Sequence, residues 1–271
     1  MAVRVEKSGP VWTVIHDRPE ARNAMDPSSA DQLTAAFLAF DADPEASVAV
    51  FYGAGGAFCA GWDLKYVSSL SAAYPLGELD IPVAGSSGNG GEIPRGPLGP
   101  SRLELDKPVI AAIEGPAVAG GMELGLWCDF RVMAQAAYFG VYCRRWGVPL
   151  IDGGTVRLPR IVGQGRALEI ILTGRKVPAE ECLRLGLCEY VVATGGARAK
   201  AEELAQDIAR FPQTCVRADR RSAIKSHGLG VREAMIQEWY NGRQALKVDG
   251  VAGAARFRDG LGRHGDFARI T

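Results

Sequence analysis

Two glycine-rich turns are the parts of this sequence best suited to chemistry. They span residues 55–63 and 115–123, and each follows a short apolar run. Such a turn presents backbone N–H groups, which at a helix N-terminus stabilise an anion or a developing oxyanion. Because only small residues let a ligand approach the main chain, the two turns together predict an oxyanion hole. The alternative is that the glycines only permit tight turns between a strand and a helix.

A carboxylic acid follows the second turn directly. Glu123 comes three residues after Gly120, in the first turn of an expected helix, with Met122 and Leu124 beside it. Apolar neighbours desolvate a carboxylate and favour its use as a general acid or base. The alternative is an acid placed in a first helical turn by the helix dipole. Serine nucleophiles, phosphate loops and dinucleotide folds lack support, because none of their motifs is present.

Apolar, β-branched runs must position these turns. We expect buried strands over residues 11–16, 48–52, 109–113, 130–133 and 190–192. The order of strand, glycine turn, helix and strand around residues 109–133 is typical of an α/β fold.

Helix signals surround the strands. Asp26 followed by Pro27 predicts a helix start, whereas Gly174 and Gly186 predict helix ends. Helical spacing also marks residues 201–211, 216–224 and 231–246, so the last 75 or so residues are expected to be all-helical. The glycine-, proline- and serine-rich stretch from Ser71 to Pro100 predicts a long loop, and loops of that length are often lids.

Composition and charge limit the kinds of binding partner and the cellular location that we expect for the chain. The chain of 271 residues has 31 Lys+Arg and 31 Asp+Glu, so its formal charge is zero, and we expect neither nucleic-acid nor membrane binding. The N-terminal residues alternate like strands, which disfavours a signal peptide and predicts a cytoplasmic protein. The six cysteines form no CxxC pair and have no zinc spacing with the three histidines. We therefore expect no metal and mostly buried, reduced thiols.

Several linked segments, in order and spacing, resemble the crotonase (enoyl-CoA hydratase/isomerase) superfamily. They are FCAGWDLK, KPVIAAIEGPAVAGGMELGLWCDFRV, the pair Phe139-Gly140, PLIDGGTVRLPRIVG and EECLRLGLCEYVV. The resemblance implies a crotonase-like spiral of ββα turns over residues 1–195 and a C-terminal helical region over residues 196–271 that packs in a trimer or a dimer of trimers. It also implies an acyl-CoA thioester substrate and no separate cofactor, since CoA belongs to the substrate.

The resemblance also assigns roles in the site. It places the two oxyanion N–H donors on Trp62 and Gly120 and a catalytic carboxylate on Glu123. The residues that it implies for CoA or substrate binding are Arg22, Ala60, Asp63, Leu64, Lys65, Gly121 and Cys143. For Arg22 the alternative is a solvated surface charge.

One catalytic position departs from the hydratase pattern. Where hydratases carry a second glutamate, counted from Phe139-Gly140, this chain has Cys143, whose neutral thiol is a poor proton shuttle. Asp152 matches, within one residue, the place where some relatives carry an active aspartate; the alternative is a turn or helix-capping aspartate. Arg144, Arg145 and Trp146 flank Cys143, and we expect at least two of them to be structural rather than to line an acyl pocket.

These observations predict an enoyl-CoA hydratase (a lyase) or enoyl-CoA isomerase that works through an enolate, as in fatty acid metabolism. One base suffices to move a double bond, whereas hydration with Glu123 alone would be slow. Two alternatives remain. The first is a non-catalytic acyl-CoA binding protein, suggested by Cys143, and the second is an acyl-CoA hydrolase or dehalogenase with Asp152 as the nucleophile.

Overall fold

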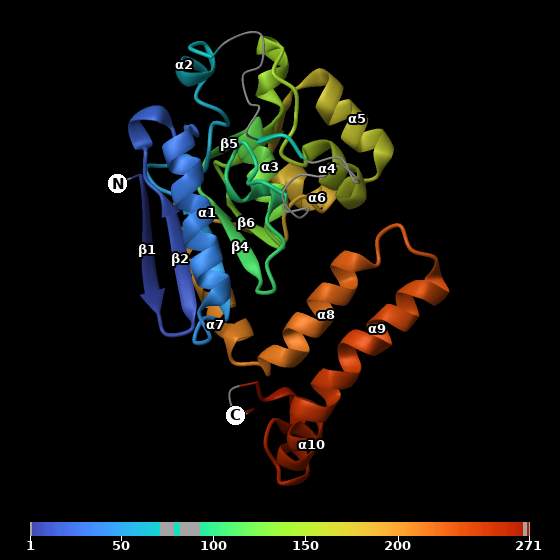
Figure 1. The fold of residues 1–271 in the computed structure, drawn as a ribbon. Coiled ribbons are helices and arrows are strands. Elements are labelled where there is room, and N and C mark those ends of the chain that lie inside the picture. Colours follow the sequence, from blue (N-terminus) through green and yellow to red (C-terminus); the bar gives the residue numbers. More distant parts are fainter. Residues whose placement is uncertain (1, 71–78, 82–92, 268–269, 271) are drawn as a thin grey trace.

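A six-stranded sheet is the centre of the fold (Figure 1). The computed structural model describes residues 2–70, 79–81, 93–267 and 270. Strands lie in the order β1-β2-β3-β4-β6-β9; β1 and β2 are antiparallel and the remaining neighbours are parallel. Their bounds are β1 Val3–Ser8, β2 Val11–His16, β3 Val48–Gly53, β4 Val109–Ile113, β6 Phe130–Ala134 and β9 Tyr190–Val192. All five predicted strands are confirmed, and strand β1 lies in the alternating N-terminal segment.

Helices cover both faces of this sheet, which explains why β3 and β4 are apolar along almost their whole length. Adjacent residues of β2 point to opposite sides. The Trp12 ring packs against Phe40 of α1 (Pro27–Ala42), whereas the Thr13 hydroxyl donates to Glu202 of α7 (Ala197–Ala209). Helix α1 begins as predicted, because the Asp26 side chain accepts a hydrogen bond from Ser29 N.

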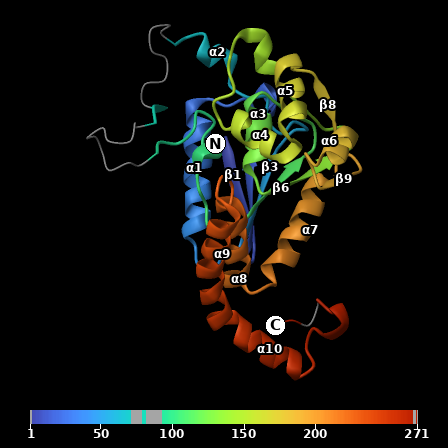
Figure 2. The same cartoon turned by 90° about the vertical axis from the view of Figure 1, so that its right-hand side faces the viewer.

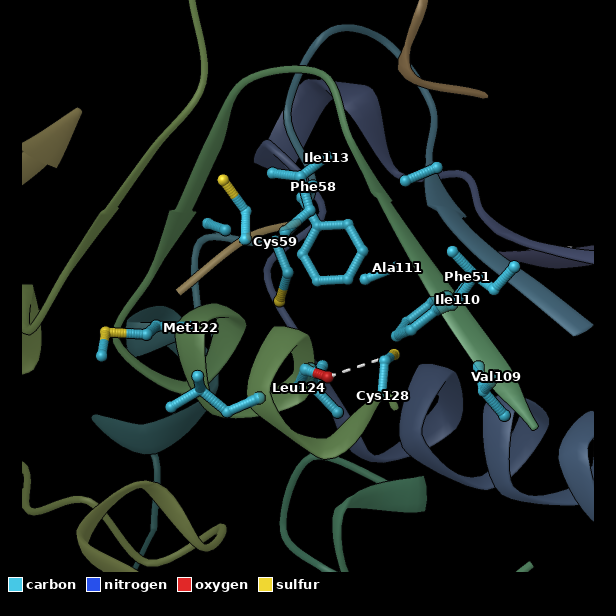
Figure 3. Packing of buried hydrophobic residues seen from close by; sticks show 14 of the residues in the cluster. Phe51, Phe58, Cys59, Val109, Ile110, Ala111, Ile113, Met122, Leu124 and Cys128 are labelled. Atoms are coloured by element: carbon cyan, nitrogen blue, oxygen red, sulfur yellow. Dashed lines mark hydrogen bonds between the residues drawn. The ribbon is translucent and has the colours of Figure 1, made fainter. Parts of the chain in front are cut away.

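A second, smaller sheet carries the turn that leads to Glu123. It has three short strands in the order β5-β7-β8, which are Pro116–Val118, Tyr138–Gly140 and Lys176–Pro178. Helix α3 (Gly120–Trp127) follows β5 and packs into the apolar core, and Figure 3 shows its residues Met122 and Leu124 among the buried side chains of this core. Buried apolar side chains therefore fix the position and direction of the α3 N-terminus.

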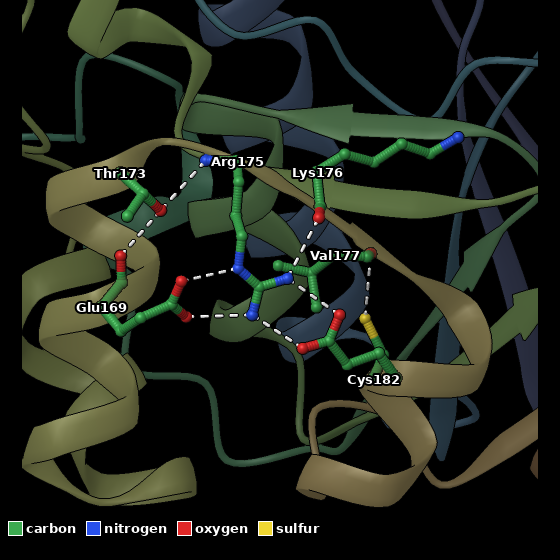
Figure 4. Close-up of polar contacts among 7 residues, drawn as sticks. Glu169, Thr173, Arg175, Lys176, Val177 and Cys182 are labelled. Carbon is green, nitrogen blue, oxygen red and sulfur yellow. Dashed lines mark hydrogen bonds and ion pairs between the residues drawn. The ribbon is translucent and has the colours of Figure 1, made fainter.

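Three short helices follow: α4 (Gly154–Val162), α5 (Gln164–Thr173) and α6 (Ala179–Leu185). Helix α4 packs against α3 and α5, whereas α6 packs against β7, β8 and β9. As predicted, Gly174 and Gly186 end α5 and α6 in left-handed conformations. The Arg175 guanidinium bridges the two helices through paired contacts to Glu169 and Glu181 (Figure 4). This bridge ties α5 to α6.

The C-terminal helices α8 (Gln213–Lys225), α9 (Val231–Ala245) and α10 (Val251–Arg258) form an arm that projects from the core in Figure 1. In Figure 2, α8 and α9 lie in front of the core and α10 lies below it. A π-helical turn, Leu246–Gly250, joins α9 to α10. Helix α7 belongs to the expected C-terminal region by sequence, but it packs on the sheet, so the arm itself begins after Pro212. The arm exposes large apolar side chains, which are Val231, Met235, Ile236, Trp239, Tyr240, Val251 and Phe257.

Other expectations have mixed outcomes. Helix α4 and the small sheet were not predicted, whereas α10 lies in the C-terminal region that is expected to be helical. Most of the expected loop from Ser71 to Pro100 lies outside the described residues. Five of the six cysteines are buried and all six are free, as expected. Within the described ranges, no helix is long and apolar enough to cross a membrane, and no three acidic, histidine or cysteine side chains cluster as metal ligands would.

Candidate active site

The two predicted glycine turns lie side by side. Cys59 and Ala117 pair in parallel, and Val118 N donates to Cys59 O at 3.0 Å. Trp62 comes three residues after Cys59, and Gly120 comes three residues after Ala117. The two residues therefore lie at the same end of the paired segments. Among the residues that the structure describes, neither the Trp62 nor the Gly120 N–H donates to another group. Two free donors therefore lie at one end of the paired turns.

Glycines let the segments that carry these two N–H donors approach each other closely, because a glycine has no side chain. Gly61 has φ +85°, and a Cβ on it would lie 3.1 Å from Gly120 N and 2.8 Å from the Ala119 Cβ. A Cβ on Gly121 would lie 2.0 Å from Cys59 O. Ala119, just before α3, has φ 54° and ψ −125°, a conformation that L-residues rarely adopt, and its own N–H is bound to Gly140 O at 2.7 Å. The close approach and this unusual peptide set the direction of the Gly120 N–H.

Glu123 lies one helical turn beyond Gly120. Its side chain is 2% exposed, and Oε1 accepts hydrogen bonds from Asp152 N at 2.9 Å and Gly154 N at 2.8 Å. In the described part of the chain, Oε2 has no hydrogen-bond partner. Burial, followed by the charge of Asp152, raises the pKa of Glu123 to about 7 despite the two amide donors. One oxygen is thus fixed and the other is free, on a group that exchanges protons near neutral pH.

Asp152 supports this arrangement from its own main chain. Its side chain is buried, and Oδ1 accepts hydrogen bonds from Leu98 N at 3.0 Å and from the Ser101 hydroxyl. Burial raises the pKa of Asp152. The Arg157 guanidinium completes the link by donating to Asp152 O at 2.9 Å and to Ser101 O at 2.8 Å. The turn that holds Glu123 is therefore joined to residues 98–101.

The sequence did not reveal Leu98, Ser101 or Arg157 as members of the site. Leu98 packs so closely on Gly120 that a Cβ there would lie 2.0 Å from a Leu98 methyl carbon. No local pattern signals Leu98 and Ser101, because they are 54 and 51 positions away from Asp152 in sequence. Arg157 is only five positions from Asp152, but it has no motif that marks it as part of the site.

A cavity of about 210 Å³ opens over these groups. Its lining combines the backbone donors and carboxylates with apolar and aromatic side chains: Arg22, Ala60, Trp62, Leu64, Leu98, Val118, Ala119, Gly120, Glu123, Tyr142, Cys143, Arg145, Trp146, Val148, Pro149, Ile151 and Asp152. Cys143 is buried on the 3₁₀ helix Tyr142–Trp146, and burial, then the charge of Glu123, raises its pKa. Contrary to expectation, both Arg145 and Trp146 line the cavity, whereas Arg144 turns away to Ile171 O.

One rim of the cavity is built from the N-terminal turn. Arg22 and Asn23 both have left-handed backbone conformations, and the buried Asn23 amide donates to Ala54 O and Ala57 O, each at 2.7 Å. This contact joins Arg22 to the first glycine turn. Arg22 itself is exposed and lines the cavity, so its cation can meet an anionic group of a bound ligand.

Not every residue expected to bind substrate lines the cavity. Ala60 and Leu64 do, but Asp63 caps the short helix α2 (Leu64–Val67) through Lys65 N at 3.0 Å and pairs with Arg18 at 3.2 Å. Lys65 is exposed on α2, and Gly121 contacts the first turn. The structure thus brings together eight of the eleven predicted site residues around one cavity and places Asp63, Lys65 and Gly121 behind or beside it.

Comparison with known proteins decides the family. The family model described as enoyl-CoA hydratase/isomerase matches residues 6–75 and 101–234. The chain belongs to the enoyl-CoA hydratase/isomerase family. The resemblance to the crotonase superfamily is thereby confirmed, and so is the fold class of an α/β crotonase core with a C-terminal helical region.

Relatives of this enoyl-CoA hydratase/isomerase family member span most of its length. Enoyl-CoA hydratase EchA19 of Mycobacterium tuberculosis is 35% identical over 237 residues, 85% of this chain and 83% of the relative. A carnitinyl-CoA dehydratase of Salmonella typhi is 34% identical over 247 residues, 88% of this chain and 84% of the relative. The crystal structure of an enoyl-CoA hydratase from Mycobacterium tuberculosis has a TM-score of 0.83 at 31% identity, covering 95% of this chain and 96% of that one.

Proposed function

We propose that this chain moves a proton at the α-carbon of an acyl-CoA thioester, with Glu123 as the acid-base group and the Trp62 and Gly120 N–H groups holding the thioester oxygen. Removing an α-proton places negative charge on that oxygen, and two fixed N–H donors stabilise the charge. The observation that carries the proposal is the Glu123 carboxylate, which is fixed through Oε1 and free at Oε2 in the cavity that holds both donors. We propose no separate cofactor or metal for this step.

Among reactions of this family, the site favours isomerisation of an enoyl-CoA over hydration. Moving a double bond needs one base that takes a proton from one carbon and returns it to another, which a single free carboxylate oxygen can do. Hydration also needs a second group to hold and deprotonate water, and the neighbouring side chain is the neutral thiol of Cys143. Hydration by Glu123 alone is therefore expected to be the slower activity.

Asp152 is proposed to position Glu123 rather than to act as a nucleophile. Its Oδ1 is occupied by two donors, and its main-chain N–H is bound to Glu123. Asp152→Asn keeps an acceptor oxygen and the main chain while removing the charge. The variant should retain proton transfer, whereas a dehalogenase or hydrolase with Asp152 as nucleophile would lose all activity.

Hydrogen exchange at the α-carbon tests the proposal without knowledge of the natural substrate. Butyryl-CoA is incubated in deuterium oxide with the wild-type protein, and deuterium at the α-carbon is measured by mass spectrometry. We expect exchange with the wild type and with Asp152→Asn, and its loss with Glu123→Gln. Binding of butyryl-CoA by calorimetry without exchange would instead support the non-catalytic acyl-CoA binding protein.

The arm supports the proposal that the protein assembles as a trimer or a dimer of trimers. Trp239, Val251 and Phe257 are each at least 60% exposed on α9 and α10, and apolar surface of this kind marks an interface. Light scattering measures the mass, and a monomer would exclude the assembly. The cytoplasmic location stays a prediction.

A further inference from the structure

A thiol faces the proposed reaction centre. Cys128, Cys182 and Cys188 direct their sulfur atoms at main-chain carbonyls, as helix and strand packing requires. Cys143 instead lines the cavity, with its residue 7% exposed. Its side chain is therefore placed where a bound ligand, and little solvent, can meet it.

Two further features of the cavity indicate which kind of ligand could react with the thiol. Glu123 is 2% exposed, yet its Oε2 has no hydrogen-bond partner among the described residues, and Glu123 lines the same cavity as Cys143. The Trp62 and Gly120 N–H groups are also free there. A base, a soft nucleophile and an oxyanion site are thus combined in one enclosure, which is the set of groups that conjugate addition requires.

We propose that Cys143 adds reversibly to the β-carbon of an α,β-unsaturated acyl-CoA, giving a 3-(S-cysteinyl)acyl-CoA held in the site. This rests on the proposed function, because it uses the same thioester position. It gives the thiol an activity of its own, the formation of a carbon–sulfur bond, which proton transfer at Glu123 assists.

The step balances without an oxidant or reductant. The Glu123 carboxylate takes the S–H proton while the sulfur–carbon bond forms at the β-carbon. The electron pair of the double bond moves toward the thioester, whose oxygen accepts from the two N–H groups. Glu123 then returns its proton to the α-carbon, so the product is the sum of thiol and enoyl-CoA.

The electrostatics of the cavity favour a base-assisted step. Burial and Glu123 raise the pKa of Cys143, so the thiol stays protonated until a base accepts its proton. Glu123, with a pKa of about 7, is half carboxylate at neutral pH and can accept it. Reaction is therefore expected at Cys143 and not at the exposed Cys215, which has no comparable site.

Intact-protein mass spectrometry with crotonyl-CoA tests the proposal. The mixture is quenched in acid, which prevents removal of the α-proton and hence reversal. We expect the wild type to gain the mass of one crotonyl-CoA, with the label on the peptide that contains Cys143. Cys143→Ser should abolish the adduct, Cys215→Ser should keep it, and Glu123→Gln should slow its formation by about 10²-fold at neutral pH.

Butyryl-CoA, which has no double bond, separates this proposal from the one on which it rests. If butyryl-CoA binds by calorimetry and exchanges its α-proton but crotonyl-CoA leaves no adduct on Cys143, the addition is refuted and the proposed function stands. An adduct distributed over Cys215 or unchanged in Cys143→Ser would also refute it. If neither thioester binds, the proposed function itself fails.

Discussion

The proton affinity of Glu123 gives the sharpest prediction, because the perturbation is simply a change of pH. Burial raises the pKa of this carboxyl to about 7 from its ordinary value of 4.5. A base with a pKa of 7 is about 9% carboxylate at pH 6 and about 91% at pH 8, a tenfold change. A carboxyl with the ordinary value would already be about 97% ionised at pH 6.

The assay is the isomerisation of a 3-enoyl-CoA, followed by the absorbance of the conjugated product. Because kcat/KM reports the free enzyme, it should rise about tenfold from pH 6 to pH 8. Glu123→Gln should reduce kcat/KM by 10²-fold to 10⁴-fold, roughly the usual contribution of a general base, and should remove the pH dependence. Calorimetric binding of butyryl-CoA over the same pH range controls for titration of the CoA phosphates.

Two results would refute this reasoning. A flat kcat/KM between pH 6 and pH 8, with binding also flat, would show that Glu123 is ionised throughout and that its burial does not control its pKa. Full activity of Glu123→Gln would show that the carboxylate takes no proton at all.

Three further predictions concern other parts of the molecule. Gly61→Ala places a Cβ 2.8 Å from the Ala119 Cβ and 3.1 Å from Gly120 N, at φ +85°, so we expect kcat/KM to fall by about 10²-fold through the disturbed donor. His16 is fully buried, its ring nitrogens have no partner in the described structure, and burial lowers its pKa from 6.5 to about 4. The unfolded chain binds this proton below pH 6.5, whereas the folded chain does not bind it until about pH 4. The free energy of unfolding should therefore fall by about 2.5 kcal/mol between pH 7 and pH 4.5, as measured by urea unfolding. The variant His16→Leu should lack this part of the loss. Arg22→Met should raise KM for acyl-CoA about fivefold at unchanged kcat, if the cation meets the CoA phosphates.

Each of these has a contrary outcome. Unchanged kinetics of Gly61→Ala would remove the close-approach argument. Equal pH slopes for wild type and His16→Leu would show that the histidine is protonated in the fold. An unaltered KM in Arg22→Met would leave that residue as an ordinary surface charge.

Local signals predicted much of the core from the sequence. The start of α1 at Asp26 is such a case, because the cap is formed by a residue three positions from its donor. The buried strands β3 and β4 are another, since uninterrupted apolar runs have few alternatives. The three-residue strands β5 and β7 carry too little pattern to be recognised, whereas β9, which is equally short, is marked by the consecutive aromatic and β-branched residues Tyr190-Val191-Val192.

The site was predictable only in part. Trp62, Gly120 and Glu123 follow recognisable turns, so their meeting around one cavity could be expected. The contacts that fix Glu123 could not, because Asp152 reaches Leu98 and Ser101 through tertiary structure alone. Tertiary packing joins segments that are this distant in sequence, and such packing leaves no periodic pattern in the sequence.

The backbone conformation at Ala119 and Gly120 affects both the stability of the native state and the proposed catalysis. A non-glycine residue at φ 54° and ψ −125° lowers the stability of the native state by about 1–3 kcal/mol. Replacing Ala119 by glycine would relieve that strain and give a more robust but less rigid protein. Selection for thermal stability and selection for turnover therefore oppose each other at this residue. A laboratory selection for thermostable variants would find that Ala119→Gly raises stability and lowers the catalytic rate.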